Sequence, residues 1–200
     1  MQQLIRTLAV GGALVAGATL MALRPATPAF ELEPGTFEVD PGHSSVVFSI
    51  VHQGVSPAYG RFNKVAGVFV FGDSLEPSSV RIEIDAASVD TNSKDRDDHL
   101  RSPDFFNVKQ YPEVVFESTS IKAKGDDEYD VAGKLSFHGV TKDVTVPMTM
   151  LGSGDKGRSG YLAGFAGEFT INRSDFGITT YPGALGEEVR ILLGIEGRKK

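Results

Sequence analysis

The chain has no cysteine among its 200 residues. Disulfide bonds, thiolate metal ligands and thiol catalysis are therefore excluded, and so is a membrane anchor built on a lipidated cysteine. A chain of this length is sufficient for one domain with a substantial core. That core must be stable without covalent cross-links.

Basic side chains are also few, with 20 Lys and Arg against 26 Asp and Glu, which gives a net charge of −6. Nucleic acids and anionic lipid headgroups are bound through concentrated positive charge. We therefore predict that the protein has no nucleic-acid partner. The sequence leaves the oligomeric state open, and a dimer is one alternative.

A hydrophobic run long enough to span a membrane is missing as well. The longest run, Leu8–Leu23, covers sixteen residues, whereas a transmembrane helix needs about 20. Arg6 precedes this run, and Thr27 and Ala29 place small side chains at the two positions that a signal peptidase recognises. We expect residues 1–29 to be a cleaved signal peptide and the mature protein to be periplasmic or secreted. An uncleaved anchor is the alternative.

No segment has the long 3.6-residue periodicity of an amphipathic helix. Instead, Val80, Ile82 and Ile84 alternate with polar residues, as expected for a strand with one buried face. The best helical candidate is the short polar segment Ser93–Arg101, which we expect to lie across one end of the β-structure. Similar alternation predicts strands at Phe37–Asp40, Ser45–His52, Val65–Phe71, Val80–Asp85, Val114–Lys122, Tyr129–Phe137, Val144–Met150, Leu162–Ile171 and Val189–Glu196.

These strands predict a single all-β domain over residues 37–200, preceded by a linker at residues 30–36. The links between consecutive strands are short, and Gly139–Thr141 in particular is typical of a hairpin. A final strand that pairs with the first would close the sheet and leave no exposed edge. We therefore favour an up-and-down antiparallel barrel of about eight strands. A Greek-key sandwich is the alternative, because alternation does not record strand order.

Several predicted strands contain glycine, which weakens a strand because it has no side chain to pack. One interpretation is that these glycines, Gly67, Gly133, Gly164, Gly167 and Gly194, form bulges and bends in the barrel wall. The other is that they leave room inside, since an eight-stranded barrel can hold one small ligand. Large apolar residues at alternate positions are then expected to line the interior, and our candidates are Phe48, Phe69, Ile82, Phe116, Leu135 and Phe169.

Patterns typical of metal or catalytic sites are scarce. None of the four histidines has another at metal-ligand spacing, so we predict no metal site and no cofactor. The Gly-x-Ser-x-Gly motif of a hydrolase nucleophile is absent. We expect His43 in a turn or at a strand start, and His52 and His138 at strand ends with a partly buried imidazole bonded to backbone.

The densest polar cluster contains Asp97 and His99 within the candidate helix. We interpret it as a charge-paired cap in which Leu100, Phe105 and Phe106 plug one end of the barrel. The alternative is an enzyme that acts on a lipid or carbonyl compound with Asp97 and His99 as an acid–base pair.

Arg173 follows a predicted strand directly. Its planar guanidinium suits a bidentate carboxylate partner, such as Asp175 or one of Asp95, Asp97 and Asp98. The functional alternative is that Arg173 lies at the mouth of a cavity and faces a polar ligand head.

Short motifs occur in a characteristic order along nearly the whole chain. They are Asp40-x-x-His43-Ser44, Gly60 with Phe62, Arg96-Asp97-x-His99-Leu100, Asp104-Phe105-Phe106, Tyr111-Pro112, Phe116-x-Ser118, Gly133-x-Leu135, His138-Gly139-Val140-Thr141 and Arg173-x-Asp175-Phe176-Gly177. In this combination the sequence resembles the YceI-like, polyisoprenoid-binding proteins of bacteria.

The resemblance implies an extended lipocalin-like barrel, export to the periplasm and a long apolar pocket for an isoprenoid chain such as a polyprenyl phosphate or a quinone. We therefore expect a carrier or sequestering protein for such a lipid, with no catalytic residues. The ligand-free alternative is an interaction protein whose barrel is solidly packed.

Overall fold

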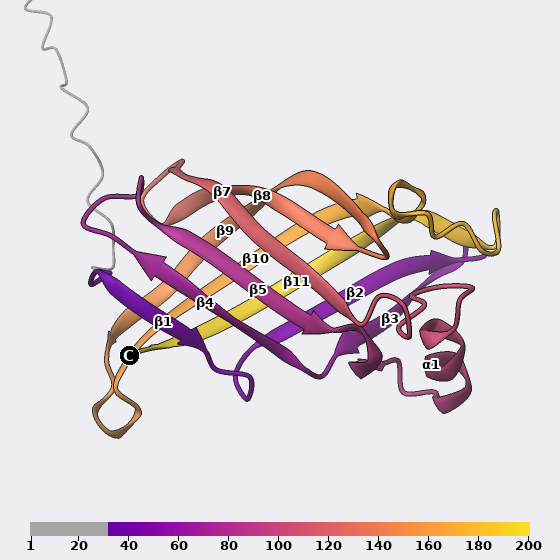
Figure 1. Ribbon diagram of the computed structural model, residues 1–200, viewed down its shortest axis with the longest axis horizontal. Helices are drawn as coiled ribbons and strands as arrows, with labels where there is room; N and C mark the ends of the chain where they lie inside the picture. The colour runs from indigo at the N-terminus through magenta and orange to yellow at the C-terminus, as the bar shows by residue number, and fades with distance from the viewer. Residues whose placement is uncertain (1–31) are drawn as a thin grey trace, which may run out of the picture.

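The structure is a computed structural model that describes residues 32–200, so the expected signal peptide at residues 1–29 lies outside the described residues. Its strands form one antiparallel sheet that curls into a barrel (Figure 1). The strands are β1 (Gly35–Val39), β2 (Ser45–His52), β3 (Ser56–Phe62), β4 (Val65–Phe71), β5 (Ser79–Asp85), β6 (Val89–Asp90), β7 (Glu113–Ala123), β8 (Glu128–Phe137), β9 (Val140–Asp155), β10 (Tyr161–Asn172) and β11 (Leu185–Lys199).

The barrel closes between the last strand and the first two. β11 pairs with β2 as far as Gly194 and then with β1 from Gly197 to Lys199, so β1 and β2 together make one bent strand of the wall. β3 and β4 make a second bent strand in the same way, because they pair with β2 and β1 respectively. The result is a closed eight-stranded, up-and-down antiparallel barrel. The prediction of a barrel is confirmed, and the sandwich alternative is wrong.

Two helical features cover one end of this barrel. α1 (Lys94–Arg101) begins after Ser93, as the sequence predicts, and lies at the end opposite the C terminus (Figure 1). A 3-10 turn at Arg173–Phe176 follows β10. We call this the helical end. No helix among residues 32–200 is both long enough and apolar enough to cross a membrane.

The opposite end, which we call the aromatic end, is filled with rings. Phe37 is completely buried and stacks on Phe69 with ring centroids 5.0 Å apart. Phe71 contacts both of them edge-on, and Phe165 lies 5.7 Å from Phe71 in a stacked arrangement. Four aromatic side chains from β1, β4 and β10 thus pack against one another at this end.

The in-strand glycines have more than one role. A Cβ on Gly133 would lie 2.5 Å from the ring of Phe116 on the neighbouring strand, so this glycine makes room for an inward aromatic side chain. Gly164 lies at a register shift between β9 and β10, as expected for a bulge in the wall. The bulge interpretation therefore applies at Gly164, whereas the space beside Gly133 is filled by the ring of Phe116 and is not left free for a ligand.

Several details of the strand prediction are wrong, among them a missed strand, the position of a turn, and the bounds of β9 and β11. β3 was not expected, because Pro57 and Gly60 interrupt its alternation, yet it pairs with β2 along its whole length. The turn between β8 and β9 consists of His138 and Gly139, both with positive φ, so Thr141 belongs to β9. This is the geometry of a two-residue type I′ hairpin.

Candidate functional site

The barrel encloses a cavity of about 230 Å³ whose accessible wall is wholly apolar. Side chains from most strands of the wall line it, together with residues of the helical end. All seven residues predicted from the sequence are among the lining residues: Phe48, Phe69, Ile82, Phe116, Leu135, Phe169 and Arg173. The interior therefore offers a water-poor surface on which an apolar chain can lie.

The helical end contributes residues that plug the cavity. Leu100, Phe105 and Phe106 line it, as the sequence predicts for a cap. Ile178 and Leu185 line it too, and sequence reasoning missed both. Ile178 lies in the segment between β10 and β11, which has no alternating pattern, and Leu185 begins β11 ahead of the predicted start at Val189. Phe62 was missed because β3 was missed. A clue was available in this case, since Gly60 and Phe62 already belonged to the family motifs.

Arg173 is 5% exposed and lies where the cavity meets the helical end. Its Nε donates to the carbonyl of Gly186 at 2.8 Å, and its Nη1 donates to the carbonyls of Ile178 and Thr180 at 3.0 and 2.8 Å. Nη2 donates to the carbonyl of Leu185 at 3.4 Å. Arg173 thus holds the segment between β10 and β11 against the barrel.

The prediction that Arg173 bonds to Asp175, Asp95, Asp97 or Asp98 is wrong. The acid nearest to it is Glu187, with Oε2 4.0 Å from Nε. The physical reason is that a buried loop presents carbonyl oxygens that need donors, and a guanidinium supplies several at once.

Asp97 and His99 hydrogen-bond to different groups. Asp97 is buried and accepts hydrogen bonds from the backbone N–H and the hydroxyl of Thr91, at 2.8 and 2.5 Å. His99 turns elsewhere, with Nε2 3.0 Å from Oδ2 of Asp104 and its ring edge-on to Phe105. Each side chain fastens a different part of the cap, which agrees with the structural interpretation.

One ionisable side chain in the cavity wall has a shifted pKa. Burial raises the pKa of Tyr129, and the negative charge of Asp127 raises it further. The phenol therefore stays protonated and neutral at physiological pH, and adds no negative charge to the cavity.

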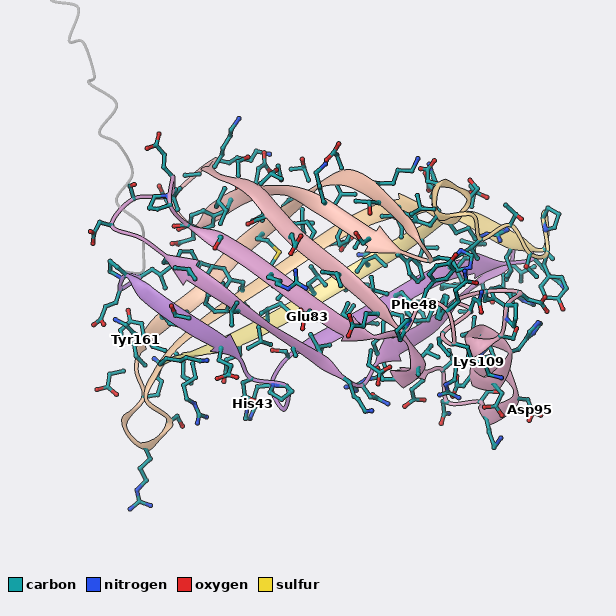
Figure 2. The ribbon with its side chains drawn as sticks, in the orientation of Figure 1. His43, Phe48, Glu83, Asp95, Lys109 and Tyr161 are labelled. Carbon is teal, nitrogen blue, oxygen red and sulfur yellow. The ribbon has the colours of Figure 1, made fainter. Side chains whose placement is uncertain are left out.

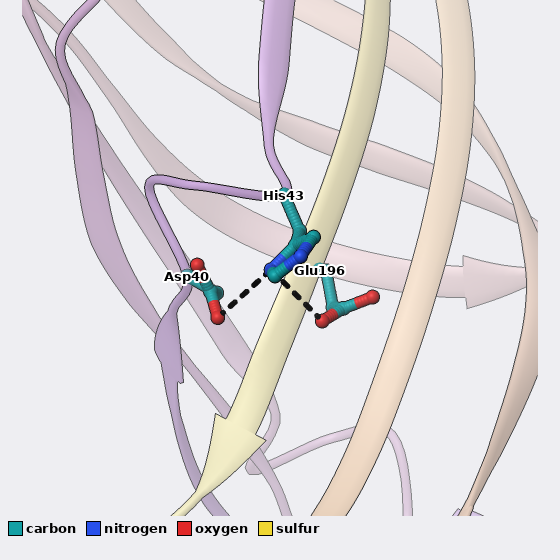
Figure 3. A group of neighbouring side chains, drawn as sticks. All are labelled: Asp40, His43 and Glu196. Atoms are coloured by element: carbon teal, nitrogen blue, oxygen red, sulfur yellow. Dashed lines mark ion pairs between the residues drawn. The ribbon is translucent and has the colours of Figure 1, made fainter. Parts of the chain in front are cut away.

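A second polar cluster lies at the bend between β1 and β2 (Figure 3). His43 Nδ1 is 3.2 Å from Oδ2 of Asp40 and 3.8 Å from Oε1 of Glu196. The hydrogen bond from His43 is the main cause that lowers the pKa of Asp40, and Arg198 also lies 3.5 Å from this carboxylate. These three groups could in principle hold a metal ion. Because Arg198 already supplies a positive charge beside Asp40 and His43 hydrogen-bonds to it, we interpret the cluster as polar contacts that fix the bend.

Two of the remaining histidines lie where the sequence predicts them, and the third differs in its burial. His43 precedes β2 in a turn, as predicted, and His138 places Nδ1 2.9 Å from the carbonyl oxygen of Phe176. His52 ends β2 but is exposed, so the expectation of a partly buried ring is wrong there.

Comparison with known proteins decides the family. A family profile described as the YceI-like domain matches residues 37–197. The chain belongs to the YceI-like family. A UPF0312 protein of Pseudomonas aeruginosa is 46% identical over 157 residues, which cover 78% of this chain and 81% of that protein. Protein YceI of Salmonella arizonae is 44% identical with the same coverage.

Solved structures support the YceI-like barrel. Burkholderia cenocepacia BcnA superposes with a TM-score of 0.72 at 30% identity, covering 79% of this chain and 98% of BcnA. A polyisoprenoid binding domain from Saccharophagus degradans superposes with a TM-score of 0.66 at 14% identity, covering 84% of this chain and all of that domain. The second likeness concerns the fold alone.

Proposed function

We propose that this YceI-like protein binds an isoprenoid lipid inside its barrel and acts as a soluble carrier or sequestering protein in the periplasm. The observation that carries the proposal is the cavity, whose accessible wall is wholly apolar and is built by side chains from around the barrel. The polyisoprenoid binding domain with the same fold supports the choice of ligand class.

The energetics favour a ligand with a long hydrocarbon chain. Burial of one CH₂ group contributes about 0.8 kcal/mol, so many weak contacts add up along such a chain. The cost of ordering the flexible chain cancels much of this gain. Affinity is then high but depends little on any single wall residue, which suits a carrier.

The charges inside the barrel favour an uncharged head group. Arg173 is the cation in the cavity wall, and its Nε, Nη1 and Nη2 all donate to backbone carbonyls. A phosphate within the cavity would lose its hydration without gaining a free cationic partner. We therefore favour a lipid of the quinone type over a polyprenyl phosphate, unless the phosphate remains outside in water.

A binding protein, rather than an enzyme, is the better interpretation of the same geometry. Asp97 accepts hydrogen bonds from Thr91, whereas His99 lies beside Asp104, so the two side chains do not act on a common group and both hold the cap together. The cavity wall itself supplies no polar surface on which charge developing in a reaction could be stabilised.

The test begins with solvent extraction of the purified, exported protein and mass spectrometry of the extract. We expect one prenyl lipid per barrel, recovered unchanged after incubation. Turnover of the lipid would instead establish an enzyme. The ligand-free alternative requires an empty extract together with no uptake of an offered prenyl quinone. The intact mass of the same protein tests the expected start near residue 30.

Leu135→Trp sharpens the test because it places a bulky indole in the cavity from a position within strand β8. The matched control is Lys134→Trp, at the next position, whose side chain is 55% exposed on the outer face. We expect loss of most bound lipid in the first variant and full occupancy in the control. A folded Leu135→Trp protein with native lipid content would contradict the proposed site.

A further inference from the structure

One wall of the barrel is incomplete. β10 pairs with β11 from Leu162 to Asn172, but it pairs with β9 only from Tyr161 to Gly167. Beyond the pair Gly167 and Met148, residues 140–147 of β9 pair with β8 alone and residues 168–172 of β10 pair with β11 alone. The two strands therefore separate toward the helical end.

Pro147 explains where the pairing stops. The pair Phe137 and Val140 closes a two-residue turn and is hydrogen-bonded, and pairs alternate from there along the hairpin. By this alternation the odd-numbered residues of β9 direct their backbone groups away from β8 and toward β10. Pro147 therefore presents a nitrogen without hydrogen to β10, at the first position where the pairing is lost.

A cleft of about 450 Å³ lies where the missing pairs would be. It is lined by Lys142–Thr145 of β9 and Phe169–Asn172 of β10, with Asp175, Phe176 and Glu188 beside them. Phe169 and Ile171 line both this cleft and the central cavity. These two side chains thus stand between the cavity and the outside of the barrel wall.

The accessible lining of the cleft is mostly polar, with charged side chains at its rim. Phe169 and Ile171, which also line the cavity, form its apolar floor. Lys142 is the one cation of the lining, against the three acids Asp143, Asp175 and Glu188. Such a rim stays hydrated and repels anionic groups. An apolar chain that reaches the floor meets Phe169 and Ile171, behind which the cavity begins.

We propose that the isoprenoid chain enters and leaves sideways through the cleft between β9 and β10, with Phe169 and Ile171 as the side chains that must move. This inference rests on the proposed function. Both ends of the barrel are less suitable, because Phe37 is completely buried at the aromatic end and Arg173 fastens the loop at the helical end. Widening the cleft breaks no ladder hydrogen bond, since none joins the strands there.

The test uses a reversible cross-link across the cleft. Thr145 and Thr170 both line it and would face each other if the register of Gly167 and Met148 continued. The double variant Thr145→Cys, Thr170→Cys is joined by a short bis-methanethiosulfonate reagent. The chain has no native cysteine, so the reagent has no other target. The matched control is Thr149→Cys, Ala166→Cys, a pair opposite each other on the same two strands where pairing is intact.

Each protein is loaded with a radiolabelled prenyl quinone before cross-linking, and its transfer to phosphatidylcholine vesicles is followed with time. We expect at least a tenfold slower transfer for the cleft cross-link, recovery on reduction, and the native rate for the control. Native transfer through the cross-linked cleft would overturn the lateral route. Failure of the native protein to load any prenyl quinone would instead contradict the proposed function.

A second pair of variants tests, without a cross-link, whether Ile171 must move when the lipid passes. Ile171→Ala shortens a side chain that separates cleft from cavity, whereas Val51→Ala shortens a 46% exposed side chain of β2 that lines neither of them. We expect several-fold faster transfer for the first and a nearly native rate for the second. Equal rates in the two variants would contradict the role of Ile171.

Discussion

The two ends of the barrel are closed by different physical means. At the aromatic end Phe37 and Phe69 stack with neighbouring rings, and the packing requires no polar partner. At the helical end a segment without regular structure crosses the opening, and Arg173 and Asp97 bind its backbone and that of the cap. In Figure 2, Asp95 and Lys109 mark the helical end and Tyr161 marks the opposite end. Strands can thus close an apolar interior by side chains alone, whereas loops bring backbone groups that need dedicated donors and acceptors.

Phe37→Ala should have the largest effect, because it removes a completely buried ring from the aromatic end. We expect the free energy of unfolding to fall by about 3–5 kcal/mol, the usual cost of such a cavity. Urea denaturation followed by circular dichroism measures it. Phe37→Leu keeps most of the side-chain volume, so its free energy of unfolding should fall clearly less. A fall below about 1 kcal/mol in the alanine variant would mean that this end collapses to fill the gap.

Arg173→Met should have the second largest effect on stability, because it leaves four carbonyl oxygens of the helical end without their donor. We expect a loss of about 2–4 kcal/mol, from roughly 1 kcal/mol for each hydrogen bond. Arg173→Lys should recover part of it, since an ammonium reaches fewer acceptors. If Arg173→Met were as stable as the native protein in denaturation curves, the helical end would not depend on this donor and the contrast between the two ends would be wrong.

Asp97→Ala should have a smaller effect within the same end. It removes the acceptor for the backbone N–H and the hydroxyl of Thr91, and we expect a loss of about 1–3 kcal/mol. Asp97→Asn keeps the accepting oxygen and should remain nearly native. Thermal unfolding of the three proteins separates loss of the acceptor from loss of the charge, and equal destabilisation in both variants would assign the effect to charge.

The bend between β1 and β2 belongs to neither end and should show the smallest effect. The folded-state pKa of Asp40 is lowered, chiefly by its hydrogen bond with His43. Its contribution to stability is therefore present above the ordinary carboxyl pKa of 3.8 and is lost as the pH falls through the lower folded value. We expect Asp40→Asn to be slightly less stable than the native protein at pH 7 and to match it in strong acid. A difference that grows in acid would contradict the ion pairs.

The sequence predicts the barrel and its lining far better than its loops. Alternation identifies which side of a strand is buried, and so Phe48, Leu135 and Phe169 could be placed inside without knowledge of strand order. The partners of Arg173 could not be predicted in this way. They are carbonyl oxygens, which every residue carries, and only the path of the loop decides which of them meet the guanidinium.

The loss of pairing between β9 and β10 could not be predicted either, although the proline that causes it is visible in the sequence. Pro147 lies within a clear alternating pattern, and its missing N–H matters only because of the direction in which it points. That direction depends on the His138–Gly139 turn, whose position the sequence prediction shifted along the chain. A strand pattern alone therefore predicts a wall but not where the wall opens.

The closure of the barrel by β11 also determines the order in which the protein can fold. Residues at opposite extremes of the described chain, such as Phe37 and Lys199, are direct neighbours in the ladder. Such non-local pairing slows folding, because a long loop must close before its contacts can stabilise it. Until β11 is available, β10, β2 and β1 have free edges open to pairing with other chains. During biosynthesis the chain therefore depends on protection from aggregation until its last strand has been made.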